Sequence, residues 1–167
     1  MSTVVIAGER LIFRLLETGD EQLIRSFYNR LSTETVYRRF LAPIVPPADN
    51  VVRRLMNIDH CRREALIALD SEGIAGVARY APFGEEGHEV AIVVADAWQR
   101  RGLGTLLMRR LSHIAHARGI TGFHATMLAE NRGAHRFLRR LWPRTSFRFV
   151  DGVIEADMPL RPQATAV

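Results

Sequence analysis

A mixed α/β fold, with helices covering a sheet that is antiparallel in part, is the architecture that the sequence predicts. Strand patterns lie near both ends of the chain, helical patterns follow the first strand, and the second half has a strand, helix, strand, helix order. The 167 residues are 47% apolar, which is enough to bury a sizeable core. We expect one domain over residues 1–160 and a disordered tail over 161–167.

The first part of the chain predicts one strand and three helices. After a loose start, the expected elements are a strand from Arg10 to Leu16, a helix capped by Thr18 or Asp20, a helix capped by Ser32, a loop from Ala42 to Asn50, and a short helix capped by Asp49 that runs through Met56. The loop is expected because its three prolines cannot donate to a ladder of hydrogen bonds.

The second part predicts a hairpin, two further strands that alternate with helices, and a final hairpin. The expected elements are the strand pair Glu64 to Asp70 and Ile74 to Tyr80, a strand from His88 to Ala95, a helix from Gly102 to Arg118, a strand from Thr121 to Leu128, a helix from Asn131 to Leu141, and the strand pair Thr145 to Val150 and Val153 to Met158. Gly119 ends the long helix, and Asp151 with Gly152 forms the last turn.

A glycine-bearing turn joins the strand from His88 to Ala95 to the long helix. Its sequence is Gln99, Arg100, Arg101, Gly102, Leu103 and Gly104. The start of a helix presents unpaired N–H groups and the positive end of the helix dipole, so the turn predicts an anion site. A Walker loop needs a lysine with serine or threonine after the glycines, and a dinucleotide turn needs glycine where Leu107 stands. Another phosphate-bearing cofactor is therefore indicated.

The charge of the chain restricts its partners and its location. All 23 basic residues are arginine, and the net charge is +5. Between Ala97 and Arg148 there are eleven arginines and one acid, Glu130, which predicts a surface that attracts acidic partners or a polyphosphate. No apolar run is long enough to cross a membrane, and the start lacks signal-peptide features, so we expect a cytoplasmic protein. Lone Cys61 has no metal-ligand spacing around it, and no metal is expected.

The segment from Ala65 to Leu141 resembles the GNAT superfamily of acetyl-CoA-dependent N-acetyltransferases. The hallmark of that family is Gln or Arg, two residues, Gly, one residue, and Gly or Ala, as in Gln99 to Gly104. Together with Arg30 to Phe40, Ile58, Asp59 and Glu64 to Ala68, the chain is similar to the acetyltransferase domain of bacterial protein lysine acetyltransferases. The resemblance implies a strongly twisted mixed sheet that splays open between its fourth and fifth strands, here His88 to Ala95 and Thr121 to Leu128.

The resemblance also implies where acetyl-CoA binds. Main-chain groups near Ile92, Val93 and Val94 would pair with the pantetheine arm as an added strand does. The pyrophosphate would lie on the amides from Arg101 to Thr105. Asn131, where the family often has asparagine, would contact pantetheine, cap the following helix, or do both.

Glu89 is the expected catalytic residue. A lysine ammonium has a pKa of about 10.4 and must lose a proton before it can attack a thioester. In the resembled acetyltransferases the general base has the place that Glu89 has here, on a strand face shared with Ala91 and Val93. We expect Glu89 to be partly buried among apolar neighbours. Without the resemblance, an exposed edge-strand glutamate would be the preferred interpretation.

Several alternatives remain open at this stage. Many members of the family have a tyrosine that can protonate the departing thiolate where this chain has Leu138. Here water, backbone N–H groups or the helix end would help the thiolate to leave, or His124 would take the role of the tyrosine. Tyr37, Arg39, Phe40 and Tyr80 could line the acceptor side or belong to the core. The favoured acceptor is a protein lysine. A small amine is the rival, with Asp59, Glu64, Glu85 and Glu86 as its acidic pocket.

A second rival is a non-catalytic module that binds acetyl-CoA or nucleic acid, although nucleic acid is not the expected partner. The sequence leaves open whether the chain forms a homo-oligomer and whether a separate domain regulates it.

Overall fold

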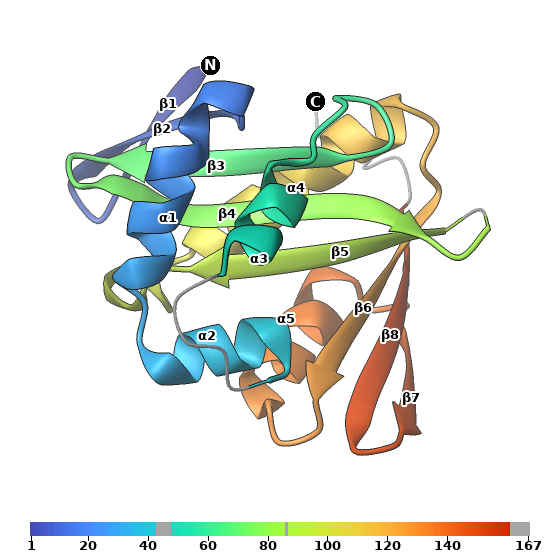
Figure 1. Cartoon of the computed structure of the whole chain (residues 1–167). Coiled ribbons are helices and arrows are strands. Elements are labelled where there is room, and N and C mark those ends of the chain that lie inside the picture. The colour runs from blue at the N-terminus through green and yellow to red at the C-terminus, as the bar shows by residue number, and fades with distance from the viewer. Residues whose placement is uncertain (43–47, 86, 161–167) are drawn as a thin grey trace.

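The computed structural model describes residues 1–42, 48–85 and 87–160, which form an eight-stranded sheet with helices on both faces (Figure 1). Along the sheet the strand order is β1-β2-β3-β4-β5-β6-β8-β7. The strands are β1 (Ser2–Ile6), β2 (Glu9–Leu15), β3 (Glu64–Asp70), β4 (Gly73–Phe83), β5 (Gly87–Val94), β6 (Gly122–Leu128), β7 (Ser146–Val150) and β8 (Val153–Pro159).

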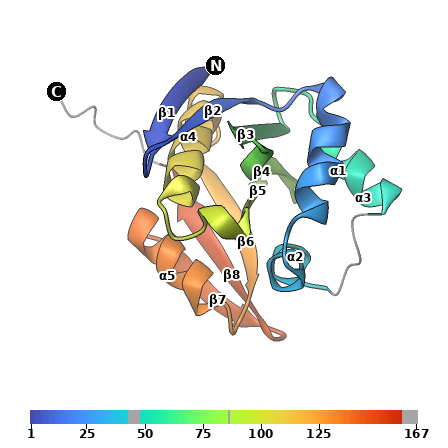
Figure 2. The ribbon, with the colours of Figure 1, turned by 90° about the vertical axis from the view of Figure 1, so that its left-hand side faces the viewer.

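Five α-helices cover the two faces of the sheet, with α4 and α5 on one side and α1, α2 and α3 on the other (Figure 2). The helices are α1 (Glu21–Asn29), α2 (Thr33–Phe40), α3 (Asp49–Met56), α4 (Leu103–Ala117) and α5 (Arg132–Leu141). Short 3₁₀ helices lie at Thr18–Asp20 and Asp96–Trp98. The described ranges contain no helix long and apolar enough to span a membrane.

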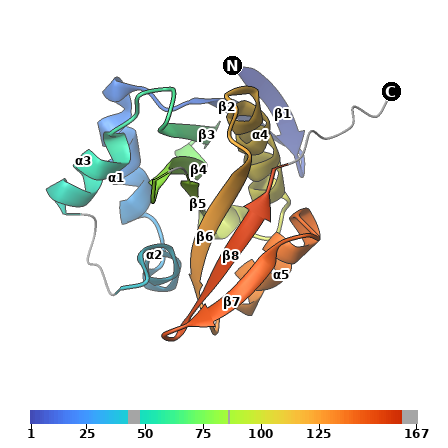
Figure 3. The same ribbon diagram turned by 90° about the vertical axis from the view of Figure 1, so that its right-hand side faces the viewer.

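All neighbouring strands of the described sheet are antiparallel except β5 and β6, which run in the same direction. The β5–β6 ladder is limited to one pair of residues, Glu89 opposite His124. Beyond this pair the two strands diverge, and β6, β8 and β7 run steeply away from β5 (Figures 1 and 3). The sheet is therefore split between β5 and β6, as the resemblance implied.

Successive side chains of β5 point to opposite faces of the sheet and so contribute to two different hydrophobic cores. Val90 belongs to the core under α4, and Ile92 and Val94 pack against that core. Val93 belongs to the core under α1 and α3. Glu89 and Ala91 share the α1 and α3 face with Val93, because residues two apart on a strand point the same way.

The helix caps, the helix stop and the hairpin turn that the sequence predicts are present in the structure. Helix α4 buries Leu103, Leu107 and Leu111 of its predicted apolar stripe, and Gly119 follows it with a φ of +83°. The Oγ atom of Ser32 accepts a hydrogen bond from the Thr35 N–H, and so caps α2 as predicted. Asp151 and Gly152, both at positive φ, turn between β7 and β8.

The structure corrects three expectations for the N-terminal part. Residues Ser2–Ile6, expected to be loose, form β1, so the split lies between the fifth and sixth strands in chain order. Asp49 does not cap α3 but is its first residue, after Ala48. Asp20 precedes α1 without a side-chain capping bond, because its carboxylate pairs with Arg14 and accepts from the Glu17 N–H. Much of the predicted loop, residues 43–47, and the predicted tail, 161–167, lie outside the described residues.

Candidate active site

The start of α4 presents amide groups that the helix itself does not use. The first helical hydrogen bond after the turn runs from the Leu106 N–H to the Gly102 carbonyl, so the N–H groups of Leu103, Gly104 and Thr105 precede it. Among the described residues, no side chain caps this end, and the first turn holds no acid. Gly102 has a φ of +90° with open space where a Cβ would lie. These features fit a diphosphate at the helix start.

The three polar side chains before Gly102 have different roles. The Gln99 Nε2 group donates to the Val94 carbonyl at 3.1 Å and to the Thr35 Oγ1 atom at 3.0 Å, so Gln99 fixes the end of β5 to α2. Arg101 stacks over Trp98 and pairs with Glu9 at 2.7 Å, which compensates part of its charge. Arg100 is exposed, with a φ of +59°.

The edge of β5 that faces the split has unpaired main-chain groups. The Ala95 N–H donates to the Ala75 carbonyl of β4, and in an antiparallel ladder residues two apart use the same edge, so Val93 also faces β4. The main-chain groups of Ile92 and Val94 therefore point toward β6, from which β5 has already diverged. Of the three predicted residues, Ile92 offers both its N–H and its carbonyl at this edge, whereas the Val93 backbone faces β4. Val94 offers its N–H only, because its carbonyl accepts from Gln99.

A cavity of about 250 Å³ occupies the split and contains the predicted catalytic residue. Its walls come from both diverging strands, from α2 and α3 on one face, and from α4 and α5 on the other. The described lining is Arg38, Arg39, Phe40, Leu41, Arg54, Glu89, Val90, Ala91, Ile92, Met108, Ala125, Thr126, Met127, Asn131, Ala134, Phe137 and Leu138. Glu89 is the one carboxylate among these residues. It is exposed, which corrects the expectation of partial burial.

The start of α5 closes the far end of this cavity. The Asn131 Oδ1 atom accepts from the Ala134 N–H at 3.0 Å, so Asn131 caps α5 and also lines the cavity, where its amide group is available to a ligand. Leu138 is buried in the same wall and has no proton to give. Gly104 faces this region from α4, and a Cβ there would lie 3.6–3.8 Å from Ile92, Val94 and Phe137.

Asp96, just after β5, holds the start of α2 next to the split between β5 and β6. Its carboxylate accepts hydrogen bonds from the Ser32 N–H at 2.9 Å, the Ser32 hydroxyl at 2.7 Å and the Thr35 hydroxyl at 2.8 Å. Burial raises the pKa of Asp96, and these hydrogen bonds outweigh that effect, so its pKa is lowered. The strand end and α2 are thereby held together, and α2 contacts both β5 and β6.

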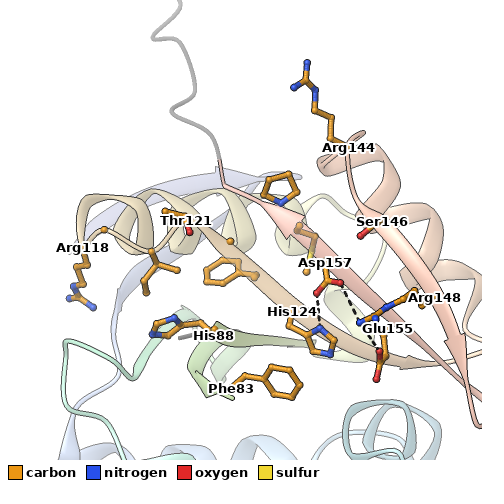
Figure 4. Close-up of a pocket in the computed structure, with 17 residues that line it drawn as sticks. Phe83, His88, Arg118, Thr121, His124, Arg144, Ser146, Arg148, Glu155 and Asp157 are labelled. Carbon is orange, nitrogen blue, oxygen red and sulfur yellow. Dashed lines mark hydrogen bonds and ion pairs between the residues drawn. The ribbon is translucent and has the colours of Figure 1, made fainter. Parts of the chain in front are cut away.

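A second, larger cleft of about 850 Å³ lies on the other side of the Glu89–His124 pair (Figure 4). The His124 Nδ1 atom lies 2.9 Å from an Asp157 carboxylate oxygen, and Phe83 stacks on the imidazole at 4.3 Å. The His124 Nε2 atom is buried without a hydrogen-bond partner among the described residues. His124 is absent from the lining of the Glu89 cavity, so it does not stand where the family's tyrosine would.

Several other candidate residues lie apart from the cavity. Tyr80 is fully buried, where it donates to the Cys61 carbonyl and accepts from Arg118. Glu64 is buried against Arg118 at 2.8 Å and His60 at 3.1 Å. Asp59 is bonded to the backbone of Cys61 and Arg63. Glu64 and Asp59 are thus engaged elsewhere. Of the predicted acidic pocket for a small amine, the three described residues, Asp59, Glu64 and Glu85, do not line the cavity, and Glu86 lies outside the described residues.

Sequence reasoning missed Arg54 and Asp96. Arg54 lies on a short helix far from the motif in sequence, and nothing in its local pattern distinguishes it from a solvated surface arginine. Asp96 carried a weak signal, because an acid directly after a strand and before a phosphate turn is well placed to cap a neighbouring helix.

Comparison with known proteins agrees with this geometry. A model of the acetyltransferase (GNAT) family matches residues 24–141. An acetyltransferase of Pseudomonas aeruginosa is 35% identical over 130 residues, 75% of this chain and 70% of that protein. Acetyltransferase Pat of Mycolicibacterium smegmatis is 31% identical over 164 residues, 93% of this chain and 48% of that protein. The chain thus spans about half the length of Pat.

A solved structure is similar over nearly its full length. The GNAT domain of S. lividans PAT superposes with a TM-score of 0.86 at 27% identity, covering 95% of this chain and 96% of that one. The split sheet and the uncapped start of the following helix agree with these comparisons, which define an acetyl-CoA-dependent acetyltransferase. The family model covers most of the chain, and the protein belongs to the GNAT family.

Proposed function

We propose that the protein transfers the acetyl group of acetyl-CoA directly to the side-chain amine of a protein lysine, with Glu89 as the general base. The observation that carries the proposal is the position of Glu89 as the one carboxylate in the described lining of the cavity between β5 and β6. The resemblance of the segment around Arg30 to Phe40 to bacterial protein lysine acetyltransferases supports lysine as the acceptor.

Acetyl-CoA, when bound, supplies a thioester that an amine can attack. The N–H groups from Arg101 to Thr105 would hold its pyrophosphate, with Gly102 leaving the approach open. The main-chain groups of Ile92 and the Val94 N–H, together with the Asn131 amide, would bind the pantetheine amides. The thioester would then lie within the cavity that Glu89 lines.

In the proposed reaction Glu89 accepts the proton that the acceptor ammonium must lose. The neutral amine forms a bond to the acetyl carbon, the carbon–sulfur bond breaks, and the sulfur leaves as a thiolate. Because Leu138 stands where the family often has tyrosine, the second proton, which the attacking nitrogen loses as the amide forms, passes through water to the thiolate. Exposed Cys61 lies outside the described cavity lining, so a covalent acetyl-cysteine step is not part of the proposal.

A CoA-release assay with a panel of acceptors tests the proposed function. The panel contains lysine peptides, spermidine and an aminoglycoside, with the modified atom identified by mass spectrometry. We expect acetylation of the lysine Nζ atom in a peptide and little reaction with the polycations. Selective acetylation of the small amines would contradict the choice of acceptor, and CoA release with no acceptor at all would contradict transfer.

A further inference from the structure

Three arginine side chains line the acceptor face of the Glu89 cavity. Arg38 and Arg39 belong to the last turn of α2, and Arg54 belongs to the last turn of α3. The described lining contains these three cations and one carboxylate, Glu89. The cavity that is to receive an amine therefore has an excess of positive charge.

Two of the three arginines lack an acidic partner in the described structure. Arg38 pairs with Glu34 one helical turn earlier. Arg39 stacks over the ring of Phe40 at 5.0 Å from its centre, and no described carboxylate forms an ion pair with Arg39 or Arg54. Arg54 is exposed and is accessible to a ligand.

Buried Arg79 adds a further positive charge behind this surface. It is 9% exposed, and its guanidinium donates to the Leu55 carbonyl at 3.1 Å and the Arg54 carbonyl at 3.3 Å, near the end of α3. Burial, followed by the charges of Arg39, Arg54 and Arg63, lowers the pKa of Arg79 to about 10. The arginines are thus close enough to repel one another, and a bound anion would relieve that repulsion.

This arrangement has two consequences for an acceptor. Carboxylates bind arginine through strong, charge-assisted hydrogen bonds, so anionic groups beside the amine would add binding energy. Nearby cations also disfavour the ammonium form, which favours the neutral amine that attacks. A polycation gains nothing from the first effect and is repelled.

We propose that the cavity selects a lysine that lies within an acidic segment of its protein substrate, with Arg39 and Arg54 binding the flanking carboxylates. This inference rests on the proposed transfer to lysine and specifies the class of lysine. The protein would therefore discriminate among lysines by the charge of their neighbours, and the discrimination would weaken as salt screens the charges.

Paired peptides test the inference. One peptide carries glutamates on both sides of a single lysine, the other carries glutamines, and kcat/KM for CoA release is measured for both at low ionic strength. We expect the glutamate peptide to be favoured by about tenfold or more, as for one charge-assisted contact. The ratio should fall toward one in Arg54→Gln, remain in Arg54→Lys, and be unchanged in Arg10→Gln, which removes an exposed arginine of β2.

Each outcome bears on a different claim. A ratio near one, or a preference for glutamine, in a protein that acetylates both peptides overturns the inference and leaves lysine acetylation standing. A preference that persists in both Arg54→Gln and Arg39→Gln overturns the assignment to these arginines. Acetylation of neither peptide contradicts the proposed function, and the inference fails with it. Because the ratio compares two substrates of the same variant, partial misfolding does not affect it.

Discussion

Glu89 and His124 lie opposite each other at the point where β5 and β6 meet and then diverge. The pair separates two hollows, because Glu89 lines the cavity inside the split and His124 lines the larger cleft outside it. The fold thus places one carboxylate where a thioester held along β5 would end. In the proposed mechanism the cavity exists because the two strands diverge, and the turn before α4 sets the orientation in which acetyl-CoA binds.

Glu89→Gln should lower kcat by about 10²-fold or more, the range typical of a lost general base. The affinity for acetyl-CoA should be almost unchanged, because an amide of the same size keeps the contacts of the cavity. Steady-state kinetics with a lysine peptide measure kcat, and calorimetry measures the affinity for acetyl-CoA. Glu85→Gln, in the exposed turn before β5, is the matched control and should behave as the wild type. Normal turnover in Glu89→Gln would remove Glu89 from the mechanism.

Gly104 should tolerate a methyl group but not a larger side chain. A Cβ at this position makes ordinary contacts with Ile92, Val94 and Phe137, whereas the branches of a leucine would extend into the space proposed for the donor. Gly104→Ala should therefore keep acetyl-CoA affinity within a few-fold, and Gly104→Leu should weaken it by about tenfold or more, equivalent to about 1.4 kcal/mol. Calorimetry with acetyl-CoA provides the comparison. Equal affinities for the two variants would argue against a donor at this helix start.

Asp20 should stabilise the fold at neutral pH, and this stabilisation should be lost at acidic pH. Its hydrogen bonds with Arg14, at 2.6 and 2.7 Å, lower its pKa despite burial, with a further bond from the Glu17 N–H. Because the folded-state pKa lies below the unfolded value of about 3.9, the contribution is complete above that value and is lost as pH falls through the folded-state pKa. Asp20→Asn should cost about 2 kcal/mol at pH 7 and less near pH 3.

Urea unfolding at several pH values measures this effect. Asp49→Asn is the control, because its ion pair with Arg25 lies at the surface and should be worth about 0.5 kcal/mol or less. If Asp20→Asn lowered the free energy of unfolding by the same amount at pH 3 as at pH 7, the pairing with Arg14 would not be the cause of the lost stability.

Arg118→Leu should destabilise the fold by about 3 kcal/mol, because it leaves the fully buried Glu64 without its nearest cation and Tyr80 without a donor. Arg109→Leu, which changes an exposed arginine on α4, the helix that Arg118 follows, should cost about 0.5 kcal/mol or less. Thermal unfolding compares the two variants. A similar loss of stability in both would mean that the buried pair is not specifically stabilising.

The sequence predicted those parts of the fold whose signals are local. The caps of α2 and α5 at Ser32 and Asn131, the Gly119 stop and the Asp151–Gly152 turn all depend on neighbours within a few residues. Strand β1 was missed because five residues carry little periodicity and because Ala7, at a φ of +50°, is an unusual turn residue.

The candidate site was less predictable, because the contacts that shape it join distant segments. That Ile92 and the Val94 N–H, and not Val93, offer free main-chain groups follows from the pairing of β5 with β4 and from the bond between Gln99 and the Val94 carbonyl. The tie between Asp96 and Ser32 spans 64 positions, and Arg54 reaches the cavity only through the packing of α3. The exposure of Glu89 likewise depends on how far β6 diverges, which no local pattern specifies.

A crystal structure with coenzyme A bound tests the central claim most directly. The account predicts the pyrophosphate on the N–H groups from Arg101 to Thr105, the pantetheine along the free edge of β5, and the thiol beside the Glu89 carboxylate. Coenzyme A bound in the outer cleft near His124, or a thiol directed away from Glu89, would contradict it.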